Sequence, residues 1–282
     1  MGLPPVVLLH GMWSTGRTLA PLQSALEARG YPVLAPTLPL HPAQGAGELA
    51  ALGRLSLTDY ACFLEEFIAG ASLTSPPVLV GHSMGGLLAQ MLATRMPTRA
   101  CVLLAPAPSA GRATIRPGHL WASRSVLKTP FFWRKPQQLP NHHADHLLFG
   151  AVEPERRARL RQSLVPESGR VYAEIAFWWL DRRRASQVNP AAVRSPMLVV
   201  GGVEDRIIPA AVVRRVANFY PHAELVMLPG RGHWFFDEPG ADEVFARVGS
   251  WLDLVCAVTD PNGSPRPAPP RLVAPARVSV PA

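Results

Sequence analysis

Residues 78–86 read Val-Leu-Val-Gly-His-Ser-Met-Gly-Gly. The first three form an apolar run typical of a buried strand, and the residues that follow carry apolar side chains at helical spacing as far as Pro97. Between the two lies Gly81-His82-Ser83-Met84-Gly85, a G-x-S-x-G pattern in which a serine occupies a tight strand-to-helix turn. The two glycines allow the close backbone approach that this turn requires. We predict that Ser83 lies at a helix N-terminus, where free N–H groups favour a developing negative charge.

A serine hydroxyl is a poor nucleophile unless a base takes its proton, and the base needs an acid to orient it. The chain offers both downstream of Ser83. A buried strand is predicted at 197–200, and the loop after it carries Asp205. A second strand, predicted at 223–228, leads into a glycine-flanked loop that contains His233. Open α/β sheets place their working groups on loops of this kind, beyond the carboxyl ends of the strands.

These elements, together with His10-Gly11 after the first predicted strand, resemble an α/β-hydrolase of the serine esterase/lipase type. Their order along the chain, serine, acid and histidine, is the order of that family. The resemblance implies Ser83 as nucleophile, His233 as general base and Asp205 as the acid that orients it.

Other residues compete for these roles. Glu204 is the neighbour of Asp205, but the G-x-x-D pattern of the family favours Asp205. The alternative role for Asp205 is that of a turn residue or helix cap before Pro209. His222 precedes the last predicted strand and so falls at the wrong end of the sheet to replace His233. His82 lies in the strand-to-helix turn of Ser83, called the elbow below, and is expected to support that turn.

The resemblance also implies an oxyanion hole, which needs two N–H donors near Ser83. The residue after the nucleophile, Met84, supplies one backbone N–H. The residue after His10-Gly11, Met12, supplies the other in relatives of this type. His10 is expected to brace this loop.

The pattern of elements predicts an α/β fold, with a mostly parallel sheet and helices on both faces. Strands are predicted at 6–9, 32–35, 78–80, 101–104, 197–200 and 223–228, with helical patterns between them. The antiparallel hairpin that usually precedes the first of these strands in the family is missing. We assign 1–105 and 191–258 to the hydrolase core, 106–190 to an inserted helical cap, and 259–282 to a disordered Pro-rich tail.

The insertion is rich in Arg, Pro, Trp and Phe, with helices predicted at 141–149, 153–163 and 168–183. Its aromatic residues either line a substrate pocket over Ser83 or form the small core of the cap itself. On the first reading the pocket residues are Trp13, Phe132, Trp133 and Trp178.

The chain has a formal net charge of +8, and much of the excess is arginine within the insertion. A solvated basic face explains this excess, although such a face also steers anionic substrates or attracts an acidic membrane surface. Nucleic-acid binding is not expected, because no binding module is evident. His142, His143, Asp145 and His146 could in principle hold zinc, but a local cluster of this kind is more often solvated surface. We expect neither a metal nor a cofactor.

Three widely separated cysteines, Cys62, Cys101 and Cys256, indicate free thiols and a reducing, cytoplasmic location, with Cys62 and Cys101 buried. No signal peptide and no membrane span is expected.

The sequence therefore predicts a serine hydrolase that cleaves a small-molecule carboxylic ester of small or medium size, largely apolar, through an acyl-enzyme. Two alternatives remain open. One is a cofactor-free perhydrolase, lactonase or C–C hydrolase with the same triad, and the other is a ligand sensor with slow turnover.

Overall fold

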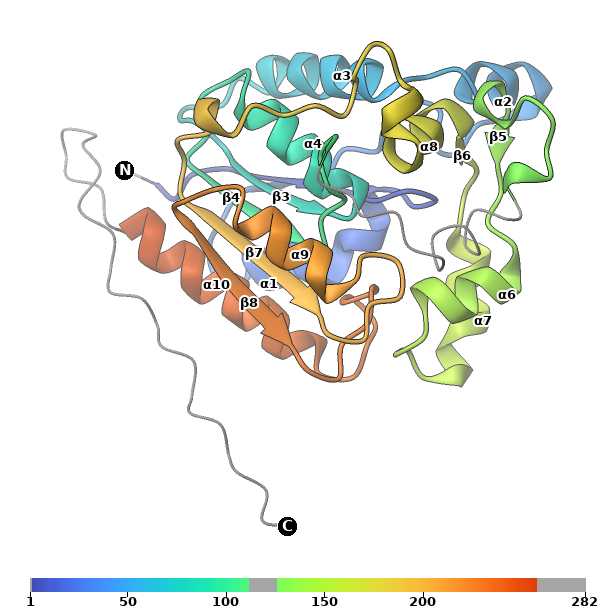
Figure 1. The fold of residues 1–282 in the computed structure, drawn as a ribbon. Helices are drawn as coiled ribbons and strands as arrows, with labels where there is room; N and C mark the ends of the chain where they lie inside the picture. The colour runs from blue at the N-terminus through green and yellow to red at the C-terminus, as the bar shows by residue number, and fades with distance from the viewer. Residues whose placement is uncertain (1, 112–125, 258–282) are drawn as a thin grey trace.

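A computed structural model of the protein describes residues 2–111 and 126–257 (Figure 1). Its centre is a six-stranded sheet in the order β2-β1-β3-β4-β7-β8, and every pairing in it is parallel. The predicted α/β class and parallel sheet are confirmed, and all six predicted strands are present. Their bounds are Val6–Leu9 (β1), Val33–Leu34 (β2), Val78–His82 (β3), Ala100–Leu104 (β4), Met197–Gly202 (β7) and Ala223–Leu228 (β8).

The sheet is buried on both faces because successive side chains of a strand point in opposite directions. In β1, Val6 and Leu8 belong to one hydrophobic cluster, while Val7 and Leu9 belong to another. Helices α1 and α10 cover the first face, and α3, α4 and α9 cover the second (Figure 1). The helices span Ala20–Glu27 (α1), Leu57–Gly70 (α3), Met84–Ala93 (α4), Ala210–Ala217 (α9) and Ala241–Ala257 (α10).

Helix α3 shows how local sequence sets an element. The Ser56 hydroxyl accepts from the N–H of Asp59 at 3.1 Å, and the Asp59 carboxylate accepts from the N–H of Ser56 at 2.8 Å. This reciprocal capping box satisfies two N–H groups at the start of the helix. The buried residues of α3 recur at helical spacing, and Cys62 falls on the opposite face. The prediction that Cys62 is buried was therefore wrong: it is exposed, whereas Cys101 on β4 is buried.

The segment 106–190, called the insertion below, separates β4 from β7. Its strands β5 (Pro136–Gln137) and β6 (Glu167–Ser168) pair antiparallel as a small two-stranded sheet, which the sequence did not predict. These paired strands are called the β5–β6 hairpin below, although residues 138–166 lie between them in the chain. In Figure 1 the described part of the insertion lies mainly on the side toward which the β7 and β8 arrows point. The remaining elements of the described insertion are α6 (Asn141–His143), a π-helical turn (Ala144–Leu148), α7 (Pro154–Ser163), α8 (Gly169–Ala176), and 3₁₀ turns at Phe132–Arg134, Trp178–Leu180 and Pro190–Ala192.

Two predicted helices of the insertion differ from the structure. The helix expected over 168–183 ends at Ala176, because Phe177 leaves helical geometry with φ −124° and ψ 36°. Its ring packs against Phe132 and Trp179, at 5.8 and 5.6 Å between ring centres, and aromatic packing of this kind outweighs the weak helix preference of these residues. The helix expected over 141–149 changes to π-helical pitch after His143.

Other elements lie outside the sequence predictions. Short helices at Gly16–Leu19 (η1) and Gly45–Leu52 (α2) follow β1 and β2 respectively. The tail predicted over 259–282 falls outside the described residues. Within the described ranges, no helix has the length and apolar character needed to cross a bilayer.

Candidate active site

Ser83 stands between β3 and α4 with a backbone conformation that serine rarely adopts, φ 54° and ψ −118°. The chain makes this turn only because glycine flanks it. A Cβ at position 81 would meet the carbonyl oxygen of Gly85, and a Cβ at position 85 would meet that of Leu9. The structure therefore shows the close backbone approach at both glycines that the sequence pattern predicted.

Neighbouring strands hold this strained turn in place. The N–H of Ser83 donates to the carbonyl of Leu104 at 2.9 Å, and its carbonyl accepts from the N–H of Ala107 at 2.9 Å. Behind the turn, buried Gln90 on α4 donates to the carbonyl of Gly86 at 3.0 Å and accepts from the Tyr220 hydroxyl at 2.9 Å. The surroundings thus stabilise a backbone geometry that is costly in isolation.

Asp205 and His233 come together from the loops after β7 and β8. The Nδ1 of His233 lies 2.7 Å from the Oδ2 of Asp205, and the two side chains are 1% and 0% exposed. The other carboxylate oxygen of Asp205 accepts from the N–H groups of Ile207 and Ile208, each at 2.8 Å. Because Nδ1 faces a carboxylate, it carries a proton, and Nε2 is the nitrogen left to accept one.

The residues that competed for these positions lie elsewhere. Glu204 is exposed, and its N–H donates to the carbonyl of Arg231 at 3.0 Å. His222 is exposed beside the Tyr220 ring. The structure therefore brings Asp205, rather than Glu204, to His233.

Glu238 holds the loop of His233, and the sequence analysis did not single it out. Its carboxylate accepts from the N–H of Gly232 at 2.8 Å and from that of Trp234 at 3.0 Å, so it grips the chain on both sides of His233. The side chain is buried, and this burial raises the pKa of Glu238. No local pattern announces such a residue, because the two N–H groups that it binds converge only in the folded loop.

His82 supports the site as expected, by bridging two loops. Its Nε2 lies 2.8 Å from the carbonyl oxygen of His233 and therefore donates a proton to it. Its Nδ1 is buried without a hydrogen-bond partner among the described residues. Burial lowers the pKa of His82 well below 6.5, so the ring is neutral and structural.

The loop after β1 reaches the same place. Met84 is the first residue of α4 and so has no acceptor for its N–H within the helix. Within the described part of the chain, no hydrogen bond engages the N–H of Met12 either. His10 braces the loop: its Nδ1–H donates to the carbonyl of Gly11 at 2.9 Å, and its Nε2 accepts from the N–H of Leu38 at 3.0 Å. Burial lowers the pKa of His10 to about 4, so it is neutral at pH 7.

A cavity of about 160 Å³ lies above Ser83, and Ser83, His233, Met12 and Met84 all line it. Its remaining wall is mainly apolar, and much of that wall comes from the insertion. Arg206 is the only Lys, Arg, Asp or Glu among the described residues that line it. Lining residues from the insertion include Val126, Leu139, Leu147, Leu148, Tyr172 and Phe177.

Of the four predicted pocket residues, the structure brings only Trp13 to this cavity. Phe132 is buried in an aromatic cluster inside the insertion, and Trp133 is 44% exposed. Trp178 does not line the cavity, whereas its neighbours Phe177 and Trp179 do. Some of the aromatic residues therefore line the cavity, and others form the core of the insertion. The sequence does not indicate which residues take which position. The histidines considered for zinc do not line the cavity, and the Nδ1 of His146 accepts from the Arg206 guanidinium at 3.0 Å.

The sequence matches a known protein family whose fold is the one described above. The sequence profile described as the alpha/beta hydrolase family matches residues 6–248, which is most of the chain. The chain belongs to the alpha/beta hydrolase family. It is a hydrolase of the class that the sequence analysis predicted.

Individual relatives of this alpha/beta hydrolase differ in their named activities. A monoacylglycerol lipase of Mycolicibacterium smegmatis is 30% identical over 213 residues, 71% of this chain and 72% of the relative. The magnesium-chelatase 30 kDa subunit of Rhodobacter capsulatus is 27% identical over 268 residues, 89% and 87% of the two chains. Among solved structures, a monoacylglycerol lipase of Paleococcus ferrophilus superposes with a TM-score of 0.67 at 23% identity, covering 90% of this chain and 97% of that one, and this likeness supports the fold alone.

Proposed function

We propose that this alpha/beta hydrolase cleaves carboxylic esters of small or medium, largely apolar molecules, with Ser83, His233 and Asp205 as its catalytic triad. One observation carries the proposal. The buried hydrogen bond between Asp205 and His233 ends at the cavity that Ser83 lines from its strained turn. A nucleophile, a base and an orienting acid around one cavity are the parts that acyl transfer needs.

In this mechanism His233 Nε2 takes the proton of the Ser83 hydroxyl as its oxygen attacks the ester carbonyl. The carbonyl π bond breaks, and the negative charge on its oxygen is stabilised by the N–H groups of Met12 and Met84. The tetrahedral intermediate then collapses, the C–O bond to the alcohol breaks, and His233 protonates the departing alkoxide. Water, deprotonated by the same imidazole, attacks the carbonyl carbon of the acyl-Ser83 ester. The bond between that carbon and Ser83 Oγ then breaks, and the imidazolium returns its proton to Oγ as the acid leaves.

The substrate class follows from the cavity. Its wall is mainly apolar, so the acyl or alcohol part that fills it gains free energy from leaving water. We propose that the insertion, residues 106–190, acts as a cap over the hydrolase core formed by 1–105 and 191–258, since it supplies much of this wall. The name of the Mycolicibacterium relative, a monoacylglycerol lipase, supports an ester with an aliphatic chain.

A fluorophosphonate probe tests the proposal, because it phosphonylates a serine only when a base activates it. We expect covalent labelling of the wild-type protein, with the added mass on the peptide that contains Ser83, together with hydrolysis of p-nitrophenyl butyrate. Both signals should vanish in Ser83→Ala. A matched control is Ser195→Ala, a buried serine that precedes β7 and therefore lies at the amino end of the sheet, away from the cavity.

Labelling that persists in Ser83→Ala would contradict the assignment of the nucleophile. Labelling of Ser83 without hydrolysis of any ester would contradict the proposed esterase activity and favour the ligand sensor instead.

A further inference from the structure

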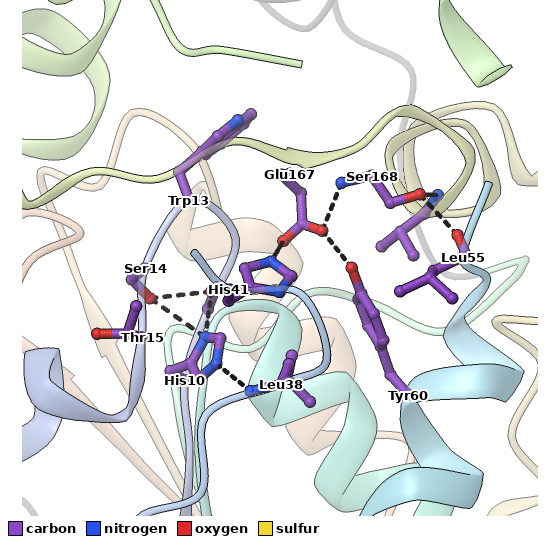
Figure 2. Close-up of polar contacts among 12 residues, drawn as sticks. His10, Trp13, Ser14, Thr15, Leu38, His41, Leu55, Tyr60, Glu167 and Ser168 are labelled. Atoms are coloured by element: carbon purple, nitrogen blue, oxygen red, sulfur yellow. Dashed lines mark hydrogen bonds and ion pairs between the residues drawn. The ribbon is translucent and has the colours of Figure 1, made fainter. Parts of the chain in front are cut away.

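A buried polar cluster joins the insertion to the core beside the loop after β1, residues 10–14, which is called the oxyanion loop below. Glu167 on β6 is the centre of this cluster (Figure 2). One carboxylate oxygen of Glu167 lies 3.3 Å from Nε2 of His41, and the two side chains are 0% exposed. The other oxygen accepts from the Tyr60 hydroxyl at 2.7 Å and from the N–H of Ser168 at 2.6 Å. The Ser168 hydroxyl in turn donates to the carbonyl of Leu55 at 2.6 Å.

The pair formed by Glu167 and His41 carries two opposite charges. The Nδ1 of His41 lies 2.9 Å from the carbonyl oxygen of Pro39, so both ring nitrogens face acceptors and both donate. Burial opposes ionisation of both partners, yet the charge of each holds the other ionised: it raises the pKa of His41 and lowers that of Glu167. A buried pair that is so fully hydrogen-bonded fixes the relative position of the segments that carry it.

His41, one partner of this pair, also contacts the oxyanion loop. Figure 2 shows His41 between Glu167 and His10, and the His41 and His10 ring centres are 5.5 Å apart. Trp13, in the same loop, makes two hydrogen bonds to the hairpin region of the insertion. Its indole N–H donates to the carbonyl of Gln137 at 3.2 Å, and its carbonyl accepts from the N–H of Val165 at 3.0 Å.

The backbone of Trp13 needs such support, because its φ of 58° lies in a region that large side chains rarely occupy. Strain of this kind persists only where the surroundings impose it. Trp13 directly follows Met12, so a change in the backbone of Trp13 displaces the residue whose N–H is the proposed donor.

We propose that the β5–β6 hairpin positions the oxyanion loop. Glu167 is a positioning residue that acts through His41, and Trp13 is the residue of the loop that is hydrogen-bonded to the hairpin region. The inference rests on the proposed function, in which the Met12 N–H stabilises the oxyanion. An oxyanion donor must point at the place where charge develops, and a misplacement of about 1 Å costs up to about 100-fold in rate. The insertion thus contributes to the chemical step as well as to the cavity wall.

Two conservative variants test this. Trp13→Phe removes the indole N–H but keeps an aromatic ring, and Glu167→Gln removes the charge but keeps the shape. The readouts are kcat and KM for p-nitrophenyl butyrate, and the affinities of two inhibitors. A hexyl trifluoromethyl ketone forms a tetrahedral adduct with an oxyanion, whereas N-methylhexanamide binds without one.

We expect each variant to lose about 10–100-fold in kcat and a similar factor in affinity for the trifluoromethyl ketone. In Glu167→Gln, whose side chain does not line the cavity, KM and amide affinity should change by less than about threefold. Because both variants act through one hairpin, the double variant should lose less than the product of the two single losses. Trp133→Phe and Glu66→Gln serve as matched controls at exposed positions of the insertion and of α3, and should match the wild type.

An unchanged kcat in Trp13→Phe would overturn the inference, even if Glu167→Gln failed to fold. Equal losses in amide and ketone affinity in Glu167→Gln would also overturn it, because they would give the hairpin a role in binding alone. A wild-type protein that neither hydrolyses esters nor reacts with a fluorophosphonate would overturn the proposed function and this inference together. Wild-type turnover with unaffected variants would overturn the inference only.

Discussion

Single residues around Ser83 and His233 act mainly by shaping the backbone. Gly81 and Gly85 permit the strained turn of Ser83, and Glu238 ties the N–H groups on both sides of His233. The reacting groups are few, and the precision of their placement comes from neighbours that take no part in proton transfer. Substitutions at these neighbours therefore separate folding from chemistry.

Gly85→Ala should destabilise the protein by about 3 kcal/mol or more, because the added Cβ would overlap the carbonyl oxygen of Leu9. Gly47→Ala is the matched control: it lies exposed in α2 with nothing within 4 Å of an added Cβ. Since alanine is the better helix former, this control should be stabilised by about 0.5–1 kcal/mol. Urea unfolding measures both, and equal effects of the two substitutions would contradict the account of the elbow.

Glu238→Gln should lower kcat/KM for p-nitrophenyl butyrate by about 10–100-fold, since an amide cannot accept from both N–H groups as the carboxylate does. The protein should remain folded, as judged by its thermal melting. Glu66→Gln is the control, because that side chain is exposed on α3, away from the loop of His233. Activity of Glu238→Gln within twofold of the wild type would show that the loop of His233 holds its position without this residue.

Sequence patterns pointed to the members of the proposed triad because each sits in a recognisable local setting. Ser83 lies between a strand and a helix, and Asp205 and His233 follow apolar runs, so each could be found from neighbouring residues alone. Glu167 and Glu238 are buried carboxylates, and what makes burial tolerable is a set of donors that meet only in the folded chain. No periodicity or spacing signals such a residue. Phe132, Trp133 and Trp178 illustrate the same limit, because aromatic residues that line a cavity and those that fill a core look alike in sequence.

At the scale of elements, the sheet and the insertion follow different rules. Strands of the sheet are short apolar runs buried on both faces, so their positions were predictable within a few residues. The strands of the β5–β6 hairpin are two residues each, and their stability depends on Glu167 and on contacts with α3 and the loop at His41. A strand that tertiary contacts stabilise, and that has no apolar run of its own, cannot be predicted from the sequence.

The buried pair of Glu167 and His41 predicts a pH-dependent stability. The pKa of Glu167 is lowered from 4.5, so its contribution is present above that value and is lost as pH falls through the folded pKa. The pKa of His41 is raised from 6.5, so its contribution is present below that value and is lost as pH rises through the folded pKa. Together they stabilise the fold fully between about pH 4.5 and 6.5.

Urea unfolding of the wild type and Glu167→Gln across pH 4 to 9 checks this window. At about pH 5.5 we expect the variant to be about 3–5 kcal/mol less stable, because His41 is left buried without its counter-ion. The difference should shrink toward both ends of the range. A difference that is the same at every pH would contradict the ion pair as its source.

At the scale of the whole molecule, residues of the insertion and of the core line an apolar cavity over the turn of Ser83. The family could be predicted from the sequence because four motifs occur in the order the family requires. The size and chemistry of the cavity could not, because its wall is assembled from segments far apart in the chain. Substrate preference is accordingly a property of the assembled molecule.

The acyl-chain profile of p-nitrophenyl esters measures this cavity. From two carbons upward, each methylene that enters the apolar wall should raise kcat/KM by up to about threefold to fourfold, corresponding to about 0.8 kcal/mol. The rise should stop once a cavity of about 160 Å³ is filled, giving an optimum at medium chain length rather than at twelve carbons or beyond. A profile that is highest for acetate would contradict an apolar acyl site.

The most direct test of the central claim is the kcat/KM of Ser83→Ala for p-nitrophenyl butyrate, measured beside Ser195→Ala and the wild type. The proposed triad predicts a loss on the order of 10³ to 10⁶ for Ser83→Ala, and activity within about twofold of the wild type for Ser195→Ala. A loss of less than about tenfold in a folded Ser83→Ala protein would contradict a role for this serine as the nucleophile.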